Sequence, residues 1–345
     1  MDLSPLSELP GVSYVMPVLN EEDYLEDAVR TILAQDYTGE KEIVLALGPS
    51  TDRSDRIAED LAAQDPRVGL VHNPGRDIPI ALNLAIAASR HPIVARVDAH
   101  SELTPDYTRR GIEALRREGA VNVGGVMRAA GRTPVQRAIA SAYNSPYGLG
   151  GGAYHGDGEA GPAESAYLGI FRREAIEAVG GYDEGIRRGE DWELNLRIRR
   201  AGGLVLFEPA LGVVYRPRAS FGDLARQFFA TGAWRAVLVR RHVGETPWRF
   251  FAPGTLVMAI AISLSLLVLQ VLGAVGWSWW SLVHLAPVAY AAGILFAAAR
   301  LPDLRGPVDR LLGAATLVTM HLSWGSGFLA GIAGFAGRTV DRSRM

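Results

Sequence analysis

Asp98 and His100 have side chains well suited to binding a metal ion. They follow the apolar run at residues 94–97 and lie two positions apart, so an extended chain would aim both side chains the same way. A carboxylate and an imidazole can share Mn²⁺ or Mg²⁺ when phosphate oxygens complete the coordination shell. Polar residues also end strands merely for solubility, so this pair alone does not specify a metal site.

A second acidic pair, Glu190 and Asp191, follows Gly189 and opens a helical pattern. Acids at a helix start can act only as caps that complement the helix dipole, and this interpretation accounts well for Asp191. It does not account for the whole string at residues 180–194, which combines glycines, the acid pair and Trp192 at a fixed spacing.

Short apolar runs alternate with helical patterns ahead of these motifs. Strands are expected at residues 12–19, 42–47, 68–72 and 93–97, and helices at residues 22–34, 54–64 and 80–89. This alternation predicts a mostly parallel α/β sheet. Ligands bind beyond the carboxyl ends of such strands, so the site is expected in the loops at residues 18–22, 47–54, 72–76 and 98–102.

The pattern loosens after Gly124-Gly125. Residues 145–164 are so rich in glycine that a loop is expected, either a surface linker or an active-site lid. Order resumes with strands at residues 166–172 and 204–208 and helices at residues 174–179 and 191–201.

The C-terminal part is strongly apolar. Residues 250–299 form a run of 50 without Asp, Glu, Lys or Arg, although 21% of the chain is charged. A membrane-spanning helix needs about 20 residues, so we divide the run at its Trp-rich centre into spans at residues 253–275 and 281–299. A third apolar stretch, residues 311–335, is interrupted at Gly325-Ser-Gly327 and is either one span or a re-entrant pair. We favour the pair, because a single span would place the C-terminal arginines outside.

Charge and cysteine content exclude several classes of function. With 35 basic and 37 acidic residues, the net charge of -2 disfavours a nucleic-acid partner. The absence of Cys excludes disulfides, thiol nucleophiles and Cys-ligated zinc. The N-terminus lacks a signal-peptide pattern, so the large first domain is expected in the cytoplasm.

Several motifs together resemble the family 2 glycosyltransferases of the GT-A fold. They are Pro17-Val-Leu-Asn20-Glu21, Ser50-Thr51-Asp52, Asn83 after a Pro-Gly-Arg turn, Asp98-Ala-His100, Gly180-Gly-Tyr-Asp183 and Gly189-Glu-Asp191. The resemblance spans roughly residues 12–211. The Gly48-Pro-Ser-Thr-Asp52 turn, the Asp-x-His pair and the membrane tail are similar to a membrane-anchored subgroup of succinoglycan biosynthesis.

This resemblance implies a Rossmann-like, nucleotide-sugar-binding domain followed by a helical membrane region. The implied domains are residues 1–217 (GT-A), 218–250 (basic amphipathic interfacial helices) and 251–345 (transmembrane). Asp191 is the implied catalytic base, and Asp98 and His100 the implied ligands of Mn²⁺ or Mg²⁺. The implied donor-binding residues are Pro17, Asn20, Glu21, Asp52, Arg76, Asn83, Asp98 and Arg235, and the acceptor-site candidates are Glu190, Trp192 and Trp234.

The sequence departs from the family pattern in places. Many members carry an acidic pair where this chain has Leu47 and Gly48, so the nucleobase must be held by Asp52 or by backbone groups. His100 replaces the second acid of the usual Asp-x-Asp motif, which shifts the expected metal preference toward Mn²⁺. Residues 227–235 resemble a Gln-x-x-Arg-Trp element with the Trp and Arg in swapped order, so Arg235 is expected to neutralise the diphosphate or to meet anionic lipid headgroups.

The predicted function is inverting, metal-dependent transfer of a sugar from a nucleotide-sugar donor to a membrane-associated acceptor. A polyprenyl-linked glycan in cell-envelope or exopolysaccharide synthesis is the acceptor that we expect. The predicted location is the inner (cytoplasmic) membrane, with several spans and a cytoplasmic catalytic domain. The alternatives are a polyprenyl-phosphate monosaccharide synthase and a non-catalytic membrane scaffold that retains a nucleotide-binding fold. A small transporter is disfavoured, because the first two spans contain no Asp, Glu, Lys or Arg.

Overall fold

The computed structural model describes residues 1, 3–149 and 158–338. Within these residues the chain forms two compact units. The described residues of the first, here called the sheet unit, are 1, 3–129 and 158–216, and those of the second, the helical unit, are 130–149 and 217–338. Residues 130–149, which the sequence did not separate from the first domain, therefore belong with the C-terminal helices.

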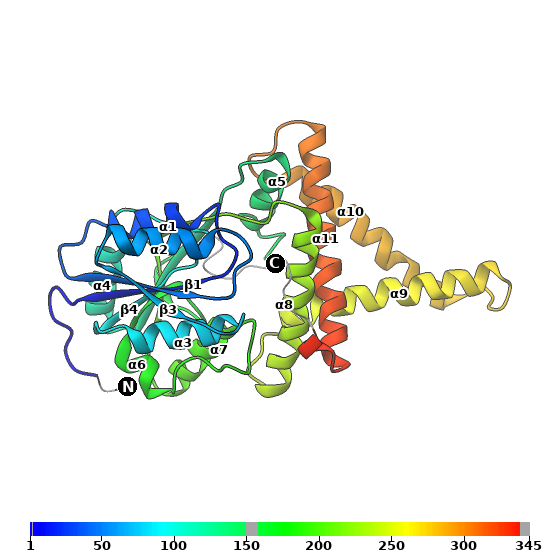
Figure 1. Cartoon of the computed structure of the whole chain (residues 1–345). Coiled ribbons are helices and arrows are strands. Elements are labelled where there is room, and N and C mark those ends of the chain that lie inside the picture. Colours follow the sequence, from blue (N-terminus) through cyan, green and yellow to red (C-terminus); the bar gives the residue numbers. More distant parts are fainter. Residues whose placement is uncertain (2, 150–157, 339–345) are drawn as a thin grey trace. The chain divides into compact units, whose positions relative to one another are not determined.

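One mixed sheet runs through the described part of the sheet unit (Figure 1). Its nine strands lie in the order β3-β2-β1-β4-β8-β6-β9-β5, with β7 also paired to β9. The strands are β1 Val12–Val18, β2 Lys41–Leu47, β3 Val68–His72, β4 Ile93–Arg96, β5 Ser101–Leu103, β6 Asn122–Ala129, β7 Gly161–Pro162, β8 Tyr167–Arg172 and β9 Val205–Tyr215. Strands β1 to β4 are mutually parallel, and β8 runs antiparallel to both β4 and β6.

Helices cover both faces of this sheet. They are α1 Leu25–Leu33, α2 Ser54–Gln64, α3 Ile78–Ala88, α4 Tyr107–Glu118, α6 Arg173–Ala178 and α7 Glu190–Arg200. Side chains alternate along β1, so Tyr14 and Met16 pack in one core with residues of α1 and α4, while Val15 packs in the other with residues of α3 and α7. The predicted α/β architecture is confirmed.

The register brings four loops to one edge of the sheet. Val18 at the end of β1 pairs with Leu47 at the end of β2, which pairs with His72 at the end of β3. Arg96, the last residue of β4, pairs with Val15. The loops that follow these strands therefore emerge together, as the sequence predicted.

Strand β6 was missed because of its glycines. A Cβ atom at Gly125 would lie 1.8 Å from the carbonyl oxygen of Leu211, and one at Gly124 would lie 2.5 Å from that of Tyr167. The pairing of β6 with β8 and with β9 shifts register at these residues. Glycine here permits close backbone approach at a bulge and does not end the strand.

The helical unit contains helices of very different length. They are α5 Pro134–Tyr143, α8 Phe221–Arg241, α9 Ala252–Val271, α10 Leu285–Arg300 and α11 Pro307–Ile332, with short 3₁₀ turns η2 Trp248–Phe250, η3 Trp279–His284 and η4 Ala336–Arg338. The sequence did not predict α5, although Thr133 and Gln136 form a capping box at its start. Two helical segments, Trp248–Val271 and Trp279–Arg300, are long and apolar enough to cross a membrane.

The expected break at Gly325-Ser-Gly327 is wrong, because α11 runs through these residues as one helix. Helices α8 and α11 lie side by side (Figure 1). A Cβ atom at Gly327 would lie 2.0 Å from the carbonyl oxygen of Phe229 on α8, and one at Gly325 would lie 2.2 Å from that of Pro253 on α9. These glycines let helix backbones approach closely, as small residues do in packed membrane helices.

Whether α11 crosses the membrane stays a prediction. Of the C-terminal arginines on which the re-entrant pair was based, Arg338 ends η4, whereas Arg342 and Arg344 lie outside the described residues.

Replacing Gly327 with alanine should destabilise the helical unit, because the added methyl group has no room beside the Phe229 carbonyl group. Overpacking costs about 1–3 kcal/mol, which exceeds the gain of about 1 kcal/mol from replacing a helical glycine with alanine. Gly293→Ala on α10 is the matched control, because nothing lies within 4 Å of a Cβ atom there. Thermal unfolding in detergent would measure the difference. A Tm for Gly327→Ala at or above that of Gly293→Ala would contradict the close packing.

Candidate active site

The loops after β1 and β2 are joined by hydrogen bonds. Asn20 has the left-handed backbone conformation (φ 54°), and its side-chain oxygen accepts from the backbone N–H of Thr51 at 2.7 Å. The Asp52 carboxylate accepts from the backbone N–H groups of Glu22 at 3.2 Å and Ser54 at 2.9 Å. Two predicted donor-binding residues, Asn20 and Asp52, thus fix the shape of these loops. Their contact with a nucleotide stays a prediction.

Glu21 and His100 face each other in the interior. Nδ1 of His100 lies 3.2 Å from Oε1 of Glu21, and each residue is only 5% exposed. The edge of the His100 ring packs on Tyr215, with the ring centroids 5.1 Å apart. Glu21, one of the predicted donor-binding residues, is therefore also a partner of the Asp-x-His motif.

A buried guanidinium joins the two acidic motifs. Arg96, whose side chain is 5% exposed, donates through Nε and Nη2 to Oδ1 of Asp98, at 3.2 Å in both cases. Its Nη1 donates to Glu190 Oε1 at 3.1 Å and also to Oδ1 of Asp191. Asp98 follows β4, whereas Glu190 and Asp191 begin α7. The structure thus brings three predicted site residues together.

Burial and the neighbouring charged groups change the pKa of Asp191. Burial disfavours its charged form, the Arg96 guanidinium favours it, and the neighbouring Glu190 and Asp98 disfavour it again. The net effect raises the pKa of Asp191 to about 7. Its side chain nevertheless keeps 27% of its accessible surface, so a substrate can reach the carboxylate. A carboxylate with a pKa near neutrality is well matched to removing a proton from a hydroxyl group.

Tyr182 contacts Asp191, and Asn83 in turn holds Tyr182 in place. The hydroxyl group of Tyr182 donates to Asp191 Oδ1 at 3.5 Å. Asn83 on α3 accepts from the backbone N–H of Tyr182 at 2.9 Å, and its amide group donates to the Tyr182 carbonyl oxygen and to the Glu184 carboxylate. Gly181 precedes Tyr182 with φ +75°, a conformation that favours glycine. Asn83 therefore fixes the glycine turn, and its predicted contact with the donor stays untested.

The remaining predicted residues are spread over both units. Pro17 lies near the end of β1, and the exposed Arg76 makes no hydrogen bond or ion pair with the described residues. Trp192 is buried on α7 of the sheet unit. Trp234 and Arg235 belong to α8 of the helical unit, where the Arg235 guanidinium carbon lies 4.2 Å from the centroid of the Phe250 ring. Their roles in donor or acceptor binding stay predictions.

At this site the described residues could supply only part of the coordination shell of a divalent cation. Among the described residues, no group of three or more His, Cys, Asp or Glu side chains could enclose a metal ion. Asp98 and His100 stay the predicted ligands, although Oδ1 of Asp98 already accepts from Arg96, and such ions commonly take further ligands from substrate phosphates. Glu21 at Nδ1 of His100 resembles the outer carboxylates that orient metal-binding histidines.

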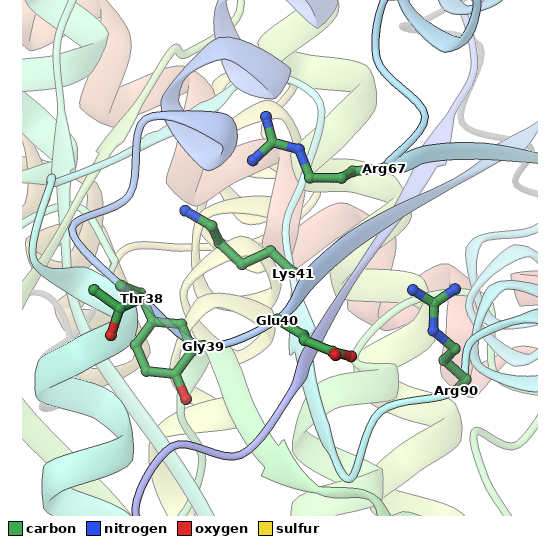
Figure 2. Close-up of a pocket in the computed structure, with 7 residues that line it drawn as sticks. Thr38, Gly39, Glu40, Lys41, Arg67 and Arg90 are labelled. Carbon is green, nitrogen blue, oxygen red and sulfur yellow. The ribbon is translucent and has the colours of Figure 1, made fainter.

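A hollow of about 500 Å³ lies at the opposite edge of the sheet and is lined by Tyr37, Thr38, Gly39, Glu40, Lys41, Arg67 and Arg90 (Figure 2). Its cations already have partners. Arg67 pairs with Asp65 at 2.6 Å, Arg90 pairs with Glu42 at 3.1 Å, and Lys41 donates to the Gln35 carbonyl oxygen at 3.0 Å. The hollow contains none of the predicted site residues, and the carboxyl edge remains the candidate active site.

Sequence reasoning missed Arg96, although a signal was present. Residues 93–97 form an apolar strand, Ile-Val-Ala-Arg-Val, in which one arginine stands among aliphatic side chains. A charge in a central strand must be paired when it is buried. Arg96 therefore required acidic partners, and Asp98 with the Glu190–Asp191 pair supplies them.

Comparisons with known proteins agree with this geometry. Residues 13–180 match the family described as Glycosyl transferase family 2. The succinoglycan biosynthesis protein ExoA of Rhizobium meliloti (strain 1021) is 33% identical over 329 residues, which cover 94% of this chain and 96% of ExoA. The chain belongs to glycosyltransferase family 2. It is therefore a glycosyltransferase, and the resemblance inferred from the motifs is confirmed.

A more distant relative and a solved structure are also similar to this chain. A dolichyl N-acetyl-alpha-D-glucosaminyl phosphate glucuronosyltransferase of Methanococcus voltae is 23% identical over 263 residues, covering 74% of this chain and 81% of that protein. The mannosyltransferase PcManGT from Pyrobaculum calidifontis, solved with GDP-Man and Mn²⁺, superposes with a TM-score of 0.58 at 21% identity. That likeness covers 96% of this chain and 89% of PcManGT. The GT-A fold predicted for this family 2 glycosyltransferase is confirmed.

The transferase should lose activity as the pH falls through about 7. Below that value the raised pKa of about 7 leaves Asp191 protonated and unable to accept a proton, whereas above it the carboxylate form dominates. The pH dependence of kcat/KM reports groups of the free enzyme and should show this acidic limb. Circular dichroism at each pH would exclude unfolding as the cause. A flat profile from about pH 5 to about pH 8 would contradict the altered acidity of Asp191.

Proposed function

We propose that this glycosyltransferase inverts configuration, moving a sugar from a nucleotide-sugar donor to a lipid-linked acceptor at the membrane surface. The observation that carries the proposal is the cluster in which Arg96 holds Asp98, Glu190 and Asp191. The cluster lies at the carboxyl edge of the sheet, where α/β proteins bind their ligands. The cluster combines Asp191, whose carboxylate is suited to proton removal, with Asp98, whose carboxylate is suited to binding a cation.

In the proposed reaction Asp191 accepts the proton of the acceptor hydroxyl group. The oxygen then forms its bond to the anomeric carbon as the bond from that carbon to the nucleoside diphosphate breaks, and the diphosphate leaves with the electron pair. One displacement inverts the anomeric configuration. Burial and the neighbouring acids raise the pKa of Asp191 to about 7, so its carboxylate is a better proton acceptor than an ordinary one.

Donor binding is assigned to the loops after β1 to β4. In this proposal Asn20 and Asp52 would shape the donor site, Pro17 and Glu21 would line it, and Arg76 and Asn83 would lie beside it. Because Leu47 and Gly48 replace the usual acidic pair, backbone groups of these loops would contact the nucleobase. Asp98 and His100 would hold Mn²⁺ or Mg²⁺, which supplies positive charge to the leaving diphosphate. Arg235 of α8 is proposed to add a further positive charge.

A membrane-associated acceptor is supported by the helical unit. The segments Trp248–Val271 and Trp279–Arg300 are long and apolar enough to span a bilayer. Trp277 between them and Trp279 at the start of the second are exposed, as is typical of aromatic residues at a membrane interface. Glu190, Trp192 and Trp234 remain the proposed acceptor contacts. ExoA is named for succinoglycan biosynthesis, and the Methanococcus voltae relative for a dolichyl-linked substrate. These names favour a polyprenyl-linked glycan in polysaccharide assembly. The proposed location of the sheet unit is the cytoplasmic side of the inner membrane.

The proposal is tested by giving the purified full-length protein a panel of nucleotide sugars with lipid extracts as acceptors. Nucleoside diphosphate release that depends on the lipid fraction would support it. A lengthened lipid-linked glycan would identify the proposed activity, whereas a lipid phosphosugar would identify the alternative, a polyprenyl-phosphate monosaccharide synthase. Release that is equally fast without lipid, or with water-soluble saccharides alone, would contradict the membrane-associated acceptor.

Asp191→Asn should abolish most transfer and leave donor binding nearly unchanged, because the carboxylate acts on the acceptor hydroxyl group. Loss of a general base typically lowers the rate by about 10² to 10⁴. Turnover and calorimetric donor binding should be measured together. Asp65→Asn, at an acid paired with the surface Arg67, is the control and should keep parental turnover. Parental turnover in Asp191→Asn would show that another group is the base.

Activity should require a divalent cation, and Asp98→Ala should reduce Mn²⁺ affinity more than His100→Asp. The second variant replaces the imidazole with a carboxylate that can also bind the cation, whereas the first removes a carboxylate. Mn²⁺ binding in the presence of nucleoside diphosphate can be followed by electron paramagnetic resonance, independently of turnover. Full activity in excess chelator would contradict metal dependence.

A further inference from the structure

Arg96 binds one carboxylate that is assigned to the donor and one that is assigned to the acceptor. Its Nε and Nη2 donate to Asp98, which is assigned to the donor, while its Nη1 donates to Asp191, which is assigned to the acceptor. Arg96 and Asp191 are 95 residues apart in the sequence, and the described structure brings them together through β4 and the start of α7.

The geometry of this contact depends on a guanidinium group. Arginine carries donors on several nitrogens in a rigid planar fork, so one side chain can bind carboxylates in different directions. A lysine ammonium is a compact point charge on a flexible stem and cannot reproduce that fork. The Arg96 side chain is only 5% exposed, so water cannot easily replace the lost contacts.

Stability alone is a poor reason for such an arrangement. Arg96 contributes one positive charge to three carboxylates, those of Asp98, Glu190 and Asp191. Burying ion pairs costs desolvation free energy, and apolar residues of similar size often stabilise a fold as well or better. The convergence of three carboxylates on one buried guanidinium at a ligand-binding edge therefore indicates a role in the reaction.

We propose that Arg96 is a positioning residue, which fixes Asp191 relative to Asp98 so that the acceptor oxygen is delivered to the donor's anomeric carbon. This inference rests on the proposed roles of Asp98 and Asp191. Arg96 touches neither substrate and acts through the two carboxylates. Displacing a reacting group by about 1 Å can lower a rate about 10²-fold, so a small change at Arg96 has a large expected effect.

The test uses Arg96→Lys in the full-length protein, which keeps a positive charge in the cluster and removes the fork. We expect kcat at saturating donor to fall about 10²-fold. Arg197→Lys is the matched control. Arg197 lies on α7 as well and pairs with the buried Glu193 through two hydrogen bonds of 2.7 Å, so its replacement should leave kcat within about threefold of the parent.

A double-mutant cycle separates positioning from a merely structural role. In the Asp191→Asn background, Arg96→Lys should lower the residual kcat by less than about threefold, because the group that Arg96 positions is already lost. A structural role would produce the same fold loss in both backgrounds, and that result would overturn the inference. The stoichiometry of nucleoside diphosphate binding would give the folded fraction of each variant, by which kcat is corrected.

Different results would overturn the positioning role of Arg96 and the base role of Asp191. Parental kcat in Arg96→Lys, together with a loss in Asp191→Asn, would overturn the positioning role and leave the base assignment standing. Parental kcat in Asp191→Asn would overturn the base assignment and the positioning role with it.

Discussion

The site depends on pairing one buried positive charge. Arg96 ends a strand in the middle of the sheet, and its guanidinium group must find acids because an unpaired charge there would be very costly. Asp98 lies in the loop that directly follows this strand. Glu190 and Asp191 lie at the start of a helix, 94 and 95 residues after Arg96. Strand β8 runs antiparallel beside β4 and so leads away from the carboxyl edge, and the chain from α6 to the start of α7 returns to that edge. Charge pairing and sheet topology thus specify the same arrangement.

Much of the sheet unit could be predicted because its signals are local. Apolar runs separated by helical patterns predict parallel strands, and the parallel pairing of β1 with β2 and β4 follows. Asp98 and Asp191 could be expected at one edge because each ends or begins an element there. The pairing of His100 with Glu21 could not, because it depends on how two loops fold across each other. Arg96 was overlooked because its strand was judged by its aliphatic neighbours.

Glycine was the main source of error, since its meaning depends on what approaches it. Gly124 and Gly125 suggested irregular chain, yet they allow β6 to lie against its neighbours at a bulge. Gly325 and Gly327 suggested a helix break, yet they let α11 pack directly on backbone carbonyl groups of other helices. Both errors have one physical cause. A missing side chain either frees the backbone or makes room for another segment, and only the tertiary structure distinguishes these cases.

The hydrogen bonds between the loops after β1 and β2 affect how specificity can be redesigned. Asn20 holds Thr51, and Asp52 holds Glu22, so neither loop keeps its shape without the other. Exchanging one loop with that of a relative would import side chains without their supporting partners. Chimeric enzymes built from this scaffold would need residues 19–22 and 50–54 transplanted as a single cassette, and natural divergence at these positions is expected to be correlated.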